Sequence, residues 1–474
     1  MANRTNPSMS LANPMPPFTD GIQKAAAAVG GIGLLILFLA FFGVDVNNSM
    51  MLTLSLVLMS VGILVYAWRA YKPLPEGIKN NGVWFSSLTN KGLLAWIAGI
   101  IITGFYVLLY WYPSVLGQGS DGAANTGLVG LFDSLSMFVK GKPASQWFVY
   151  GTLYTVAILV FGFKFILKYR HNTYQIIRTL SVMFFQLAFA FLIPELLEGL
   201  NDPLKSGAWF GTDMKNMWPL DYDFFHKWHL DNLRNGGSLG LFMLGLGLAL
   251  IFIISPLLTY FYGKRWYCSW VCGCGGLAET AGDPFRHLSD KSLNAWKIER
   301  WMIHSVLVFV FIMTALVLYQ YFTGHGSFLG IPIYPVQKWY GFLIGAAFSG
   351  VVGVGFYPLM GSRVWCRFGC PMAALLGLQQ KFFSRFRITT NGNQCISCGN
   401  CSAYCEMGID VRSYAQRGQN IVRASCVGCG ICAAVCPRGV LKLENGSKDI
   451  NTKTDAIRAI HIDEGSLTIR GNAI

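Results

Sequence analysis

The sequence predicts an all-α polytopic membrane bundle of about eight transmembrane helices, followed by a small C-terminal α+β domain. Three observations lead to this prediction. Of the 474 residues, 53% are hydrophobic and only 13% are charged, whereas a soluble domain has about 25% charged residues. Long apolar stretches recur as far as residue 360, and all 13 cysteines lie between Cys268 and Cys436.

Eight apolar stretches are long enough to cross a hydrocarbon layer of about 30 Å as helices. They lie near residues 25–44, 49–68, 93–112, 146–167, 176–195, 238–261, 302–322 and 340–360. Aromatic residues that prefer membrane edges, such as Trp68, Trp111 and Trp147, lie near their ends. Residues 1–20 are polar and Pro-rich, which indicates a short tail and no removable signal peptide.

Basic residues are distributed unevenly between the two sides of these spans. With the N-terminus inside, the inner segments and adjoining helix ends contain 30 of the 37 Lys and Arg residues. Because cytoplasmic loops are enriched in Lys and Arg, both termini and every cysteine motif should face the cytoplasm of a bacterial cell, with the spans in its inner membrane. The net charge of +14 is then a topology signal that needs no nucleic-acid partner.

The spans and loops divide the chain into six expected parts. These are a cytoplasmic N-terminal tail (1–24), spans one to five (25–200), a periplasmic loop (201–237), spans six to eight with paired cysteine motifs (238–385), the C-terminal domain (386–445) and a cytoplasmic tail (446–474). Val440–Leu443 and Leu467–Arg470 have the pattern of short strands.

The C-terminal domain contains two cysteine runs with the same spacing, C-x2-C-x2-C-x3-C. The first run is Cys395, Cys398, Cys401 and Cys405; the second is Cys426, Cys429, Cys432 and Cys436. Tandem runs of this kind hold two [4Fe–4S] clusters, and the fourth cysteine of each run ligates the other cluster. We therefore expect one cluster on Cys395, Cys398, Cys401 and Cys436, and its partner on Cys426, Cys429, Cys432 and Cys405.

Zinc is the alternative ligand of these runs, because C-x2-C pairs also bind it. Eight cysteines in a doubled register favour iron–sulfur clusters over zinc. The second run is followed by Pro437, as expected, but the first is followed by Glu406. We expect Glu406 to weaken the turn after Cys405 without removing a ligand.

An internal repeat carries the other five cysteines where spans six and eight are expected to leave the membrane. Gly263, Arg265, Cys268 and Cys272 recur 98 residues later as Gly361, Arg363, Cys366 and Cys370. Such a duplication indicates two similar elements around a pseudo-symmetric site. The copies differ in that the first has Gly273 and Cys274 where the second has Pro371 and Met372.

The paired cysteines are candidate metal ligands. Positions i and i+4 of a helix share a face, so each pair could present two thiolates to one metal. Cys268, Cys272, Cys274, Cys366 and Cys370 could together hold a further iron–sulfur centre, zinc or copper. Arg265 and Arg363 would lower the thiol pKa values or offset the charge of a cluster. Reduced, unliganded cysteines at helix ends are the alternative.

Six other polar residues are weaker candidates. His226 and His229 on the outer side could ligate haem or copper, but a structural role is favoured for this pair. Glu195 and Glu198 at the outer end of span five suggest a proton or quinol contact, which interfacial solvation explains equally well. His171 and His304 are interpreted as snorkelling or capping groups on the inner side.

The cysteine motifs resemble those of the membrane-bound polyferredoxins, which include the NapH-type quinol dehydrogenase subunit and the C-terminal half of NosR-type proteins. The resemblance covers roughly residues 238–445 and is carried by Cys268-Ser-Trp-Val-Cys272, Cys366-Arg-Phe-Gly-Cys370-Pro371 and the tandem runs. It implies electron transfer at the membrane between the quinone pool and a partner redox protein. Copper-linked relatives that assist oxidase assembly share this architecture. Gly273 and Cys274 depart from the usual motif, and the first four spans lack a counterpart in a four-span core.

The sequence thus predicts a membrane-integral iron–sulfur protein that relays electrons between the quinone pool and partner redox subunits or carriers of a respiratory chain. If it is an enzyme, we expect a quinol dehydrogenase type of oxidoreductase in which the cysteines are ligands and no residue is an acid–base catalyst. Two alternatives remain open. One is a copper-reducing assembly factor for a respiratory oxidase, and the other is a structural or redox-sensing subunit of a larger membrane complex.

Overall fold

The computed structural model describes residues 20–44, 49–72, 91–120, 123–200, 218–220, 222–391, 394–446, 460–463 and 466–469. Three of the expected parts fall largely outside these residues: the N-terminal tail up to residue 19, the outer loop at 201–217 and most of the tail beyond residue 446.

Seven helices in the described part of the chain are long and apolar enough to cross a membrane. Four are single helices: α1 (Gly21–Phe41), α2 (Ser49–Tyr71), α3 (Leu93–Trp111) and α6 (Gln146–Lys168). The fifth joins α7 (Thr173–Leu187), η3 (Ala188–Leu192) and α8 (Ile193–Leu200), and the sixth joins α10 (Gly237–Ala249), η5 (Leu250–Ile254) and α11 (Ser255–Tyr262). The seventh is α14 (Leu293–Thr323). The predicted helical membrane bundle is confirmed.

The eighth expected span is broken into short segments instead of forming one regular helix. It consists of α15 (Ile333–Tyr340), the π-helical η7 (Gly341–Val352), α16 (Gly353–Gly355) and α17 (Tyr357–Met360). Glycines in these segments allow neighbouring groups to approach closely where a side chain would not fit. A Cβ at Gly350 would lie 2.7 Å from the Tyr110 ring, and one at Gly355 would lie 2.3 Å from Thr103 Oγ1 of α3.

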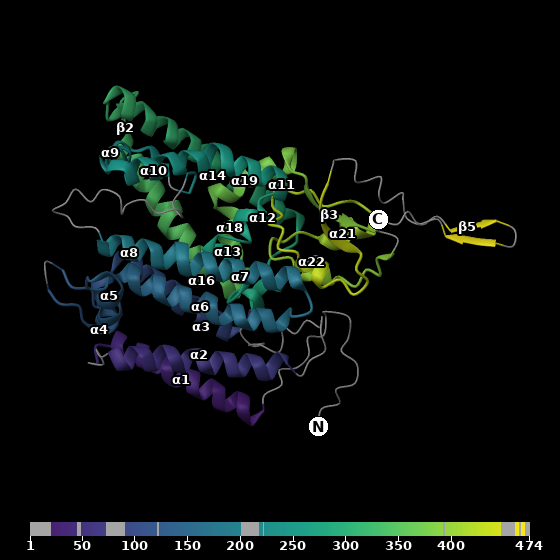
Figure 1. Ribbon diagram of the computed structural model, residues 1–474, viewed down its shortest axis with the longest axis horizontal. Coiled ribbons are helices and arrows are strands. Elements are labelled where there is room, and N and C mark those ends of the chain that lie inside the picture. Colours follow the sequence, from purple (N-terminus) through teal and green to yellow (C-terminus); the bar gives the residue numbers. More distant parts are fainter. Residues whose placement is uncertain are drawn as a thin grey trace.

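Short elements cover the two ends of the bundle (Figure 1). At one end lie η2 (Pro113–Leu116), α4 (Gly127–Leu131), α5 (Asp133–Lys140), η4 (Tyr222–Phe225), α9 (Lys227–Asn235) and the hairpin of β1 (Ser327–Phe328) with β2 (Ile331–Pro332). We call this the far end. Toward the other end lie α12 (Arg265–Cys268), α13 (Gly273–Glu279), η6 (Asp283–Leu288), α18 (Val364–Phe368) and α19 (Pro371–Phe383).

The C-terminal domain, here called the cysteine module (residues 386–445), packs on that second end (Figure 1). It contains β3 (Phe386–Thr390), α20 (Asn400–Ala403), α21 (Val411–Gln416), α22 (Ile431–Ala434) and β4 (Leu441–Asn445). Strands β3 and β4 are antiparallel, with Phe386 opposite Asn445 and Thr390 opposite Leu441. Beyond the module, β5 (Ile460–Asp463) pairs with β6 (Ser466–Ile469). The strands expected near 440–443 and 467–470 are therefore present, and the α+β prediction is confirmed.

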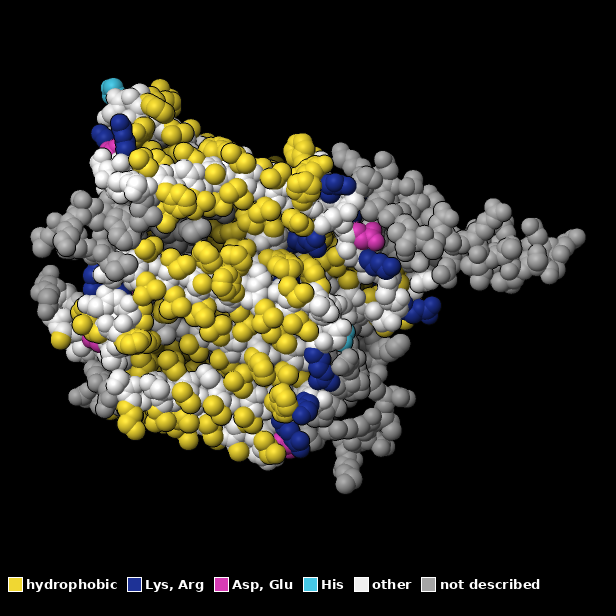
Figure 2. Space-filling model, in the orientation of Figure 1, with side chains coloured by type: hydrophobic (Ala, Val, Ile, Leu, Met, Phe, Trp, Pro, Cys, Tyr) yellow, Lys and Arg dark blue, Asp and Glu magenta, His cyan; other side chains and the backbone are white. Residues whose placement is uncertain are grey.

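Apolar side chains cover the visible flank of the helices, and Lys and Arg side chains gather where this surface meets the cysteine module (Figure 2). Many leucines, isoleucines and phenylalanines of the membrane helices are exposed, such as Leu35, Ile100 and Phe252. A belt of apolar side chains bounded by charge suits a lipid environment. The protein is a multi-pass membrane protein by the length and composition of its helices.

Helices α1 and α2 pack side by side through small residues. The Ser55 hydroxyl donates a hydrogen bond of 2.7 Å to the Gly33 carbonyl oxygen. A Cβ at Gly62 would lie 2.6 Å from the Ala26 carbonyl oxygen and 2.7 Å from the Gly30 nitrogen. Membrane helices associate through such close backbone contacts, because lipid gives no hydrophobic driving force between them.

Replacing Gly62 by valine should separate α1 from α2 and lower the thermal stability of the protein in detergent. The branched side chain must displace backbone atoms, a cost of about 1–3 kcal/mol for an overpacked contact. The matched control is Gly31→Val in α1, since a Cβ at Gly31 meets nothing within 4 Å. Equal melting temperatures for the two variants would contradict this packing.

Candidate metal centres

The cysteine module is built from two similar halves that are 31 residues apart. Gly399 and Gly430 have φ angles of +77° and +74° and begin α20 and α22, respectively. Each lies directly after the second cysteine of its run. Glycine adopts this left-handed conformation without a Cβ clash. The chain can therefore make a tight turn after the second cysteine of each run.

The structure brings the eight module cysteines together as two groups. A small internal cavity is lined by four of them: Cys405, Cys426, Cys429 and Cys432. The Cys401 thiol is close enough to interact electrostatically with those of Cys398, Cys436 and Cys395. Each group therefore combines three cysteines of one run with the fourth cysteine of the other.

Backbone groups support the fourth cysteine of each run in the same way. The Ile409 N–H donates to Cys405 Sγ over 3.4 Å, and the Val440 N–H donates to Cys436 Sγ over 3.3 Å. Hydrogen bonds to the sulfur atoms of a cluster stabilise its negative charge and tune its potential. The donor set and its surroundings thus fit a cubane in each half.

Burial raises the pKa of several of these thiols, including two in the second group and one in the first. It raises the pKa of Cys429 to about 12, that of Cys426 to about 11 and that of Cys401 to about 12. These thiols are therefore neutral at neutral pH unless a cation binds them. Metal ligation requires the thiolate and releases the proton, so a bound metal centre would supply the charge that burial opposes.

The second run faces the membrane bundle and is held there by hydrogen bonds to its backbone carbonyl oxygens. Their donors come from several elements: Tyr174 to Gly428 (2.9 Å), Gln175 to Cys429 (2.8 Å), Ser269 to Val427 (2.8 Å), Lys264 to Ala424 (2.5 Å) and Gln380 to Cys426 (2.8 Å). Ile396 of the first run is 47% exposed. The second run thus contacts the bundle directly, and the first run reaches the surface of the module at Ile396.

Glu406 docks the module on the bundle. Its side chain is fully buried, with ion pairs of 2.8 Å to Arg286 and 3.0 Å to Arg363. Burial alone would raise the pKa of Glu406, but the two arginines outweigh burial and hold this pKa below its usual range. The expectation of a weaker turn was wrong, since the Gly408 N–H reaches the Cys405 carbonyl oxygen over 3.1 Å, as the Gly439 N–H reaches Cys436 over 3.2 Å.

Further buried charges continue from this contact into the bundle. Glu279 pairs with Arg363 and with Arg178, and Asp283 pairs with Lys164, Lys168 and Arg286. Carboxylate oxygens of Glu279 and Glu406 lie within 4.8 Å of the Cys429 sulfur. Because arginines already occupy both carboxylates, this group acts as a charge network rather than as a separate cation site.

The two C-x3-C motifs have the same local structure. Gly263 (φ +66°) and Gly361 (φ +93°) turn the chain after α11 and α17. Cys272 and Cys370 then begin α13 and α19 in extended conformations. Each motif therefore spans a break between two short helices, and the expected placement of both thiols on one helical face was wrong.

The first motif also lies deeper than expected. A Cβ at Gly273 would lie 2.4 Å from Gln186 Oε1 and 3.5 Å from the Tyr154 ring. Gln186 is in the middle of the fifth span, and Tyr154 is well inside α6. After leaving α11, the chain thus turns back into the bundle, so this motif is not confined to the membrane edge.

The structure brings the five bundle cysteines (Cys268, Cys272, Cys274, Cys366 and Cys370) together. Cys268, Cys366 and Cys370 are buried in one core cluster and Cys272 packs against it. Cys274 lies two residues beyond Cys272 in the chain. Thiols from both copies of the repeat thus converge on one region, where they could share a metal centre.

The two repeat arginines differ in position. Arg363 is buried, with its guanidinium 3.6 Å from Cys366 Sγ and 3.2 Å from the Cys268 carbonyl oxygen. Arg265 instead reaches Asn445 of the module over 3.2 Å and lies over the Phe386 ring. We expected both arginines to lie beside the cysteine thiols, but only Arg363 does so.

A row of aromatic rings leads from these thiols toward the far end. Tyr154 contacts Tyr150 with ring centroids 5.2 Å apart, and Trp147 contacts Tyr150 at 6.4 Å. Tyr110 lies 5.1 Å from Trp147 and 5.8 Å from Trp111. The sequence analysis missed this row, although the spacing of four residues between Tyr150 and Tyr154 places both rings on one helix face.

The other polar candidates have structural contacts. His226 caps α9 through its side chain, and His229 is buried against Phe224 and Trp228. Glu195 and Glu198 pair with Lys140 at 2.9 Å and 3.2 Å. His171 approaches the Ala434 carbonyl oxygen of the module at 3.4 Å. These contacts favour the structural interpretations.

Comparisons with known proteins agree with the motif pattern. Residues 394–441 match the family described as a 4Fe-4S dicluster domain. Residues 244–292 and 341–389 each match a 4Fe-4S binding domain, so both copies of the repeat belong to this match.

Two curated relatives are similar to parts of the chain. The protein named "Putative electron transport protein YccM" from Escherichia coli K12 is 27% identical over 181 residues, covering 36% of this chain and 48% of the relative. An uncharacterized protein of Methanocaldococcus jannaschii is 27% identical over 166 residues, covering 34% of this chain and 58% of the relative. The chain thus spans about half the length of each relative. No solved structure matches.

Replacing Glu406 by alanine should undock the cysteine module. The change leaves Arg286 and Arg363 without this partner in a buried site, and breaking a buried ion pair costs about 3–5 kcal/mol. We expect faster limited proteolysis between residues 383 and 395 and a lower melting temperature. Glu444→Ala on β4 is the control, because Glu444 is only half-buried and forms no ion pair among the described residues. Proteolysis at the same rate in both variants would argue against docking through Glu406.

Proposed function

We propose that this protein transfers electrons at a membrane through iron–sulfur centres, between the quinone pool and partner redox proteins of a respiratory chain. One observation carries the proposal: cysteines of both module groups and of the bundle belong to one core cluster, which includes Cys401, Cys432 and Cys366. Redox centres exchange electrons only when they are close together, and a shared core supports exchange between the module and the membrane bundle.

The module cysteines are assigned as ligands of two [4Fe–4S] clusters. One cluster would be held by Cys395, Cys398, Cys401 and Cys436, and the other by Cys426, Cys429, Cys432 and Cys405. The cavity lined by the second set and the matched sulfur hydrogen bonds support this assignment. When bound, such clusters supply one-electron redox chemistry.

A further metal centre is assigned to the bundle cysteines, Cys268, Cys272, Cys274, Cys366 and Cys370. Convergence of both repeat copies and the match of each to a 4Fe-4S binding domain support it. Arg363 would offset the negative charge of a thiolate centre here, since its guanidinium lies beside Cys366 Sγ. The role of the protein is to bury the thiols, donate hydrogen bonds to them and set their electrostatic surroundings.

The finer assignment follows the resemblance to the NapH-type polyferredoxins. In it the cysteine module faces the cytoplasm of a bacterial inner membrane and quinol is the membrane-phase partner. The Lys and Arg side chains at the module end support this orientation, because positive charge is typical of the cytoplasmic side (Figure 2). The relative named as an electron transport protein supports the general class of function.

Serine in place of one cysteine of each module group should remove one cluster and leave the other. We expect Cys398→Ser to remove the outer cluster signal and Cys429→Ser the inner one, each with about four fewer irons per chain. Electron flow should stop in both variants, because the module clusters act in series. Iron analysis and electron paramagnetic resonance of the reduced protein measure this. Unchanged iron and spectra in both variants would refute the assignment.

The total iron content separates two clusters from three centres. About eight irons and eight acid-labile sulfides per chain correspond to two cubanes, and about twelve to a third at the bundle cysteines. We expect more than eight, with the excess lost in Cys268→Ser/Cys366→Ser. Copper in place of that excess iron would favour the metal-handling function instead.

A further inference from the structure

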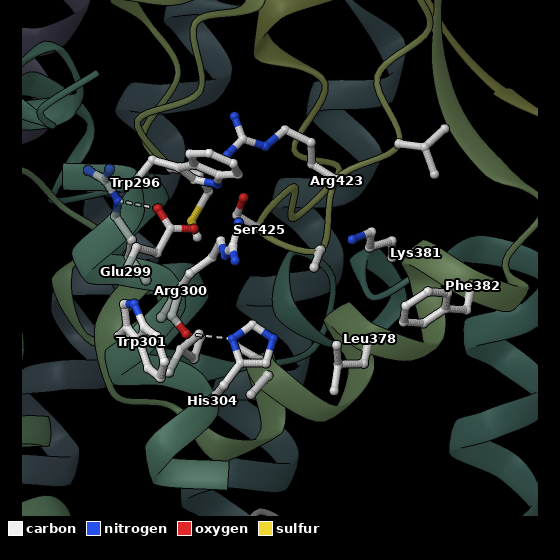
Figure 3. Close-up of a pocket in the computed structure, with 18 of the residues that line it drawn as sticks. Trp296, Glu299, Arg300, Trp301, His304, Leu378, Lys381, Phe382, Arg423 and Ser425 are labelled. Atoms are coloured by element: carbon white, nitrogen blue, oxygen red, sulfur yellow. Dashed lines mark hydrogen bonds and ion pairs between the residues drawn. The ribbon is translucent and has the colours of Figure 1, made fainter. Parts of the chain in front are cut away.

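A cavity of about 630 Å³ opens between α14, α19 and the cysteine module (Figure 3). This volume is within the range of sites for small molecules. Cys366 of the bundle group contributes to its wall, as do Ala424 and Ser425, which directly precede Cys426 of the inner module group. A ligand in this cavity would therefore lie beside two of the three thiol groups.

The cavity is accessible from the membrane side. Trp301 and Phe382 line it and are 77% and 55% exposed, respectively. The neighbouring Ile298 and Phe383 are also exposed apolar side chains. Exposed aromatic and aliphatic groups at a helix end are typical of the membrane interface. A molecule with an apolar tail could thus leave the bilayer and place a polar head in the cavity.

Three cationic side chains line the cavity, of which Arg300 and Lys381 are exposed and Arg423 is half-buried (Figure 3). Arg300 and Arg423 lie over the Trp296 ring at 5.1 Å and 5.0 Å, and Lys381 lies near Phe382. Among the residues that the structure describes, none of these three cations forms an ion pair. By contrast, Arg367 of the same cavity is paired with Glu299 at 2.8 Å. The cations are available to a ligand that carries or develops negative charge.

His304 offers a proton acceptor in this cavity. Its Nδ1 lies 2.6 Å from the Arg300 carbonyl oxygen. A carbonyl oxygen only accepts hydrogen bonds, so Nδ1 is protonated, and in the neutral imidazole Nε2 carries the lone pair. The imidazole extends toward the open part of the cavity (Figure 3). The hydrogen bond from Nδ1 thus fixes the orientation of the imidazole and leaves Nε2 facing the cavity. The sequence analysis expected only a snorkelling or capping role for His304.

We propose that this cavity binds the quinol head group and that His304 accepts one of its protons. This inference rests on the proposed electron-transfer function and gives its membrane-phase substrate a site. Oxidation of one quinol breaks both O–H bonds. Two electrons pass singly to two iron–sulfur acceptors, each reduced by one electron. One proton goes to His304 Nε2 and the other to water at the rim, and Arg300, Lys381 and Arg423 stabilise the negative charge that develops on the ring oxygens.

The test uses the purified full-length protein in lipid nanodiscs. Binding of a short-chain quinone is followed by quenching of tryptophan fluorescence, which does not depend on turnover. Reduction of the clusters by the corresponding quinol is followed by the bleaching of their visible absorbance, with dithionite as a chemical reductant. The variants are His304→Gln and Arg300→Gln/Arg423→Gln. The controls are His325→Gln near the far end and Lys297→Gln, which is on α14 outside the cavity.

We expect His304→Gln to bind the quinone within about threefold of the native affinity but to slow quinol-dependent reduction at least about tenfold, as loss of a general base does. The double arginine variant should lose both binding and reduction, and dithionite should reduce the clusters fully in every variant. Native quinol rates in both cavity variants would overturn the site while leaving the proposed function intact. If quinol fails to reduce the native protein and dithionite succeeds, the quinone function itself is wrong. Displacement of the quinone signal by anionic phospholipid alone would make the cavity a lipid site, which also overturns the inference.

Discussion

The structure depends on buried ion pairs between the cysteine module and the membrane bundle. Glu406 of the module lies between Arg286 and Arg363 of the bundle with no exposed side-chain surface. A buried charge is tolerated only when it is paired. The cysteine module can therefore dock on the bundle only in the position where Glu406 contacts both arginines. Arg363 also contacts Glu279 and approaches Cys366 Sγ. One guanidinium thereby links the docking contact to the bundle thiols.

The two copies of the internal repeat have similar backbone conformations, but their charged residues contact different partners. Both copies turn at a glycine and begin a helix at their second cysteine. In the first copy, Lys264 binds the second cysteine run and Arg265 reaches the end of β4. In the second, Arg363 serves the thiols and the docking carboxylate. Lys264 has Ser362 at its equivalent position, whereas the equivalent arginines Arg265 and Arg363 have different partners. The duplicated scaffold can thus hold thiols on one side and the module on the other.

The thiol groups, the cavity and the aromatic row follow one direction through the molecule. The second cysteine run contacts the bundle through the carbonyl oxygen of Cys429, and the first C-x3-C motif reaches the level of Tyr154 at Gly273. The aromatic row continues from Tyr154 to Trp111 at the far end. Because the lipid-accessible cavity adjoins the middle of this series, electrons from the membrane phase would enter between the module and the bundle thiols.

The sequence by itself determined the helical membrane bundle, the α+β module and the cysteine runs, because apolar length and ligand spacing are local properties of the chain. Even its departures were visible, such as Glu406 in place of proline, and Gly273 and Cys274 in the first C-x3-C copy. Only the tertiary structure decided what these residues do. Glu406 forms an ion pair with Arg286, which is 120 positions away in the chain. Gly273 packs near Tyr154 in the middle of α6, and Gly350 packs against the ring of Tyr110. These contacts join distant segments, and the energy of a buried charge or a close backbone approach depends on a partner that no local pattern specifies.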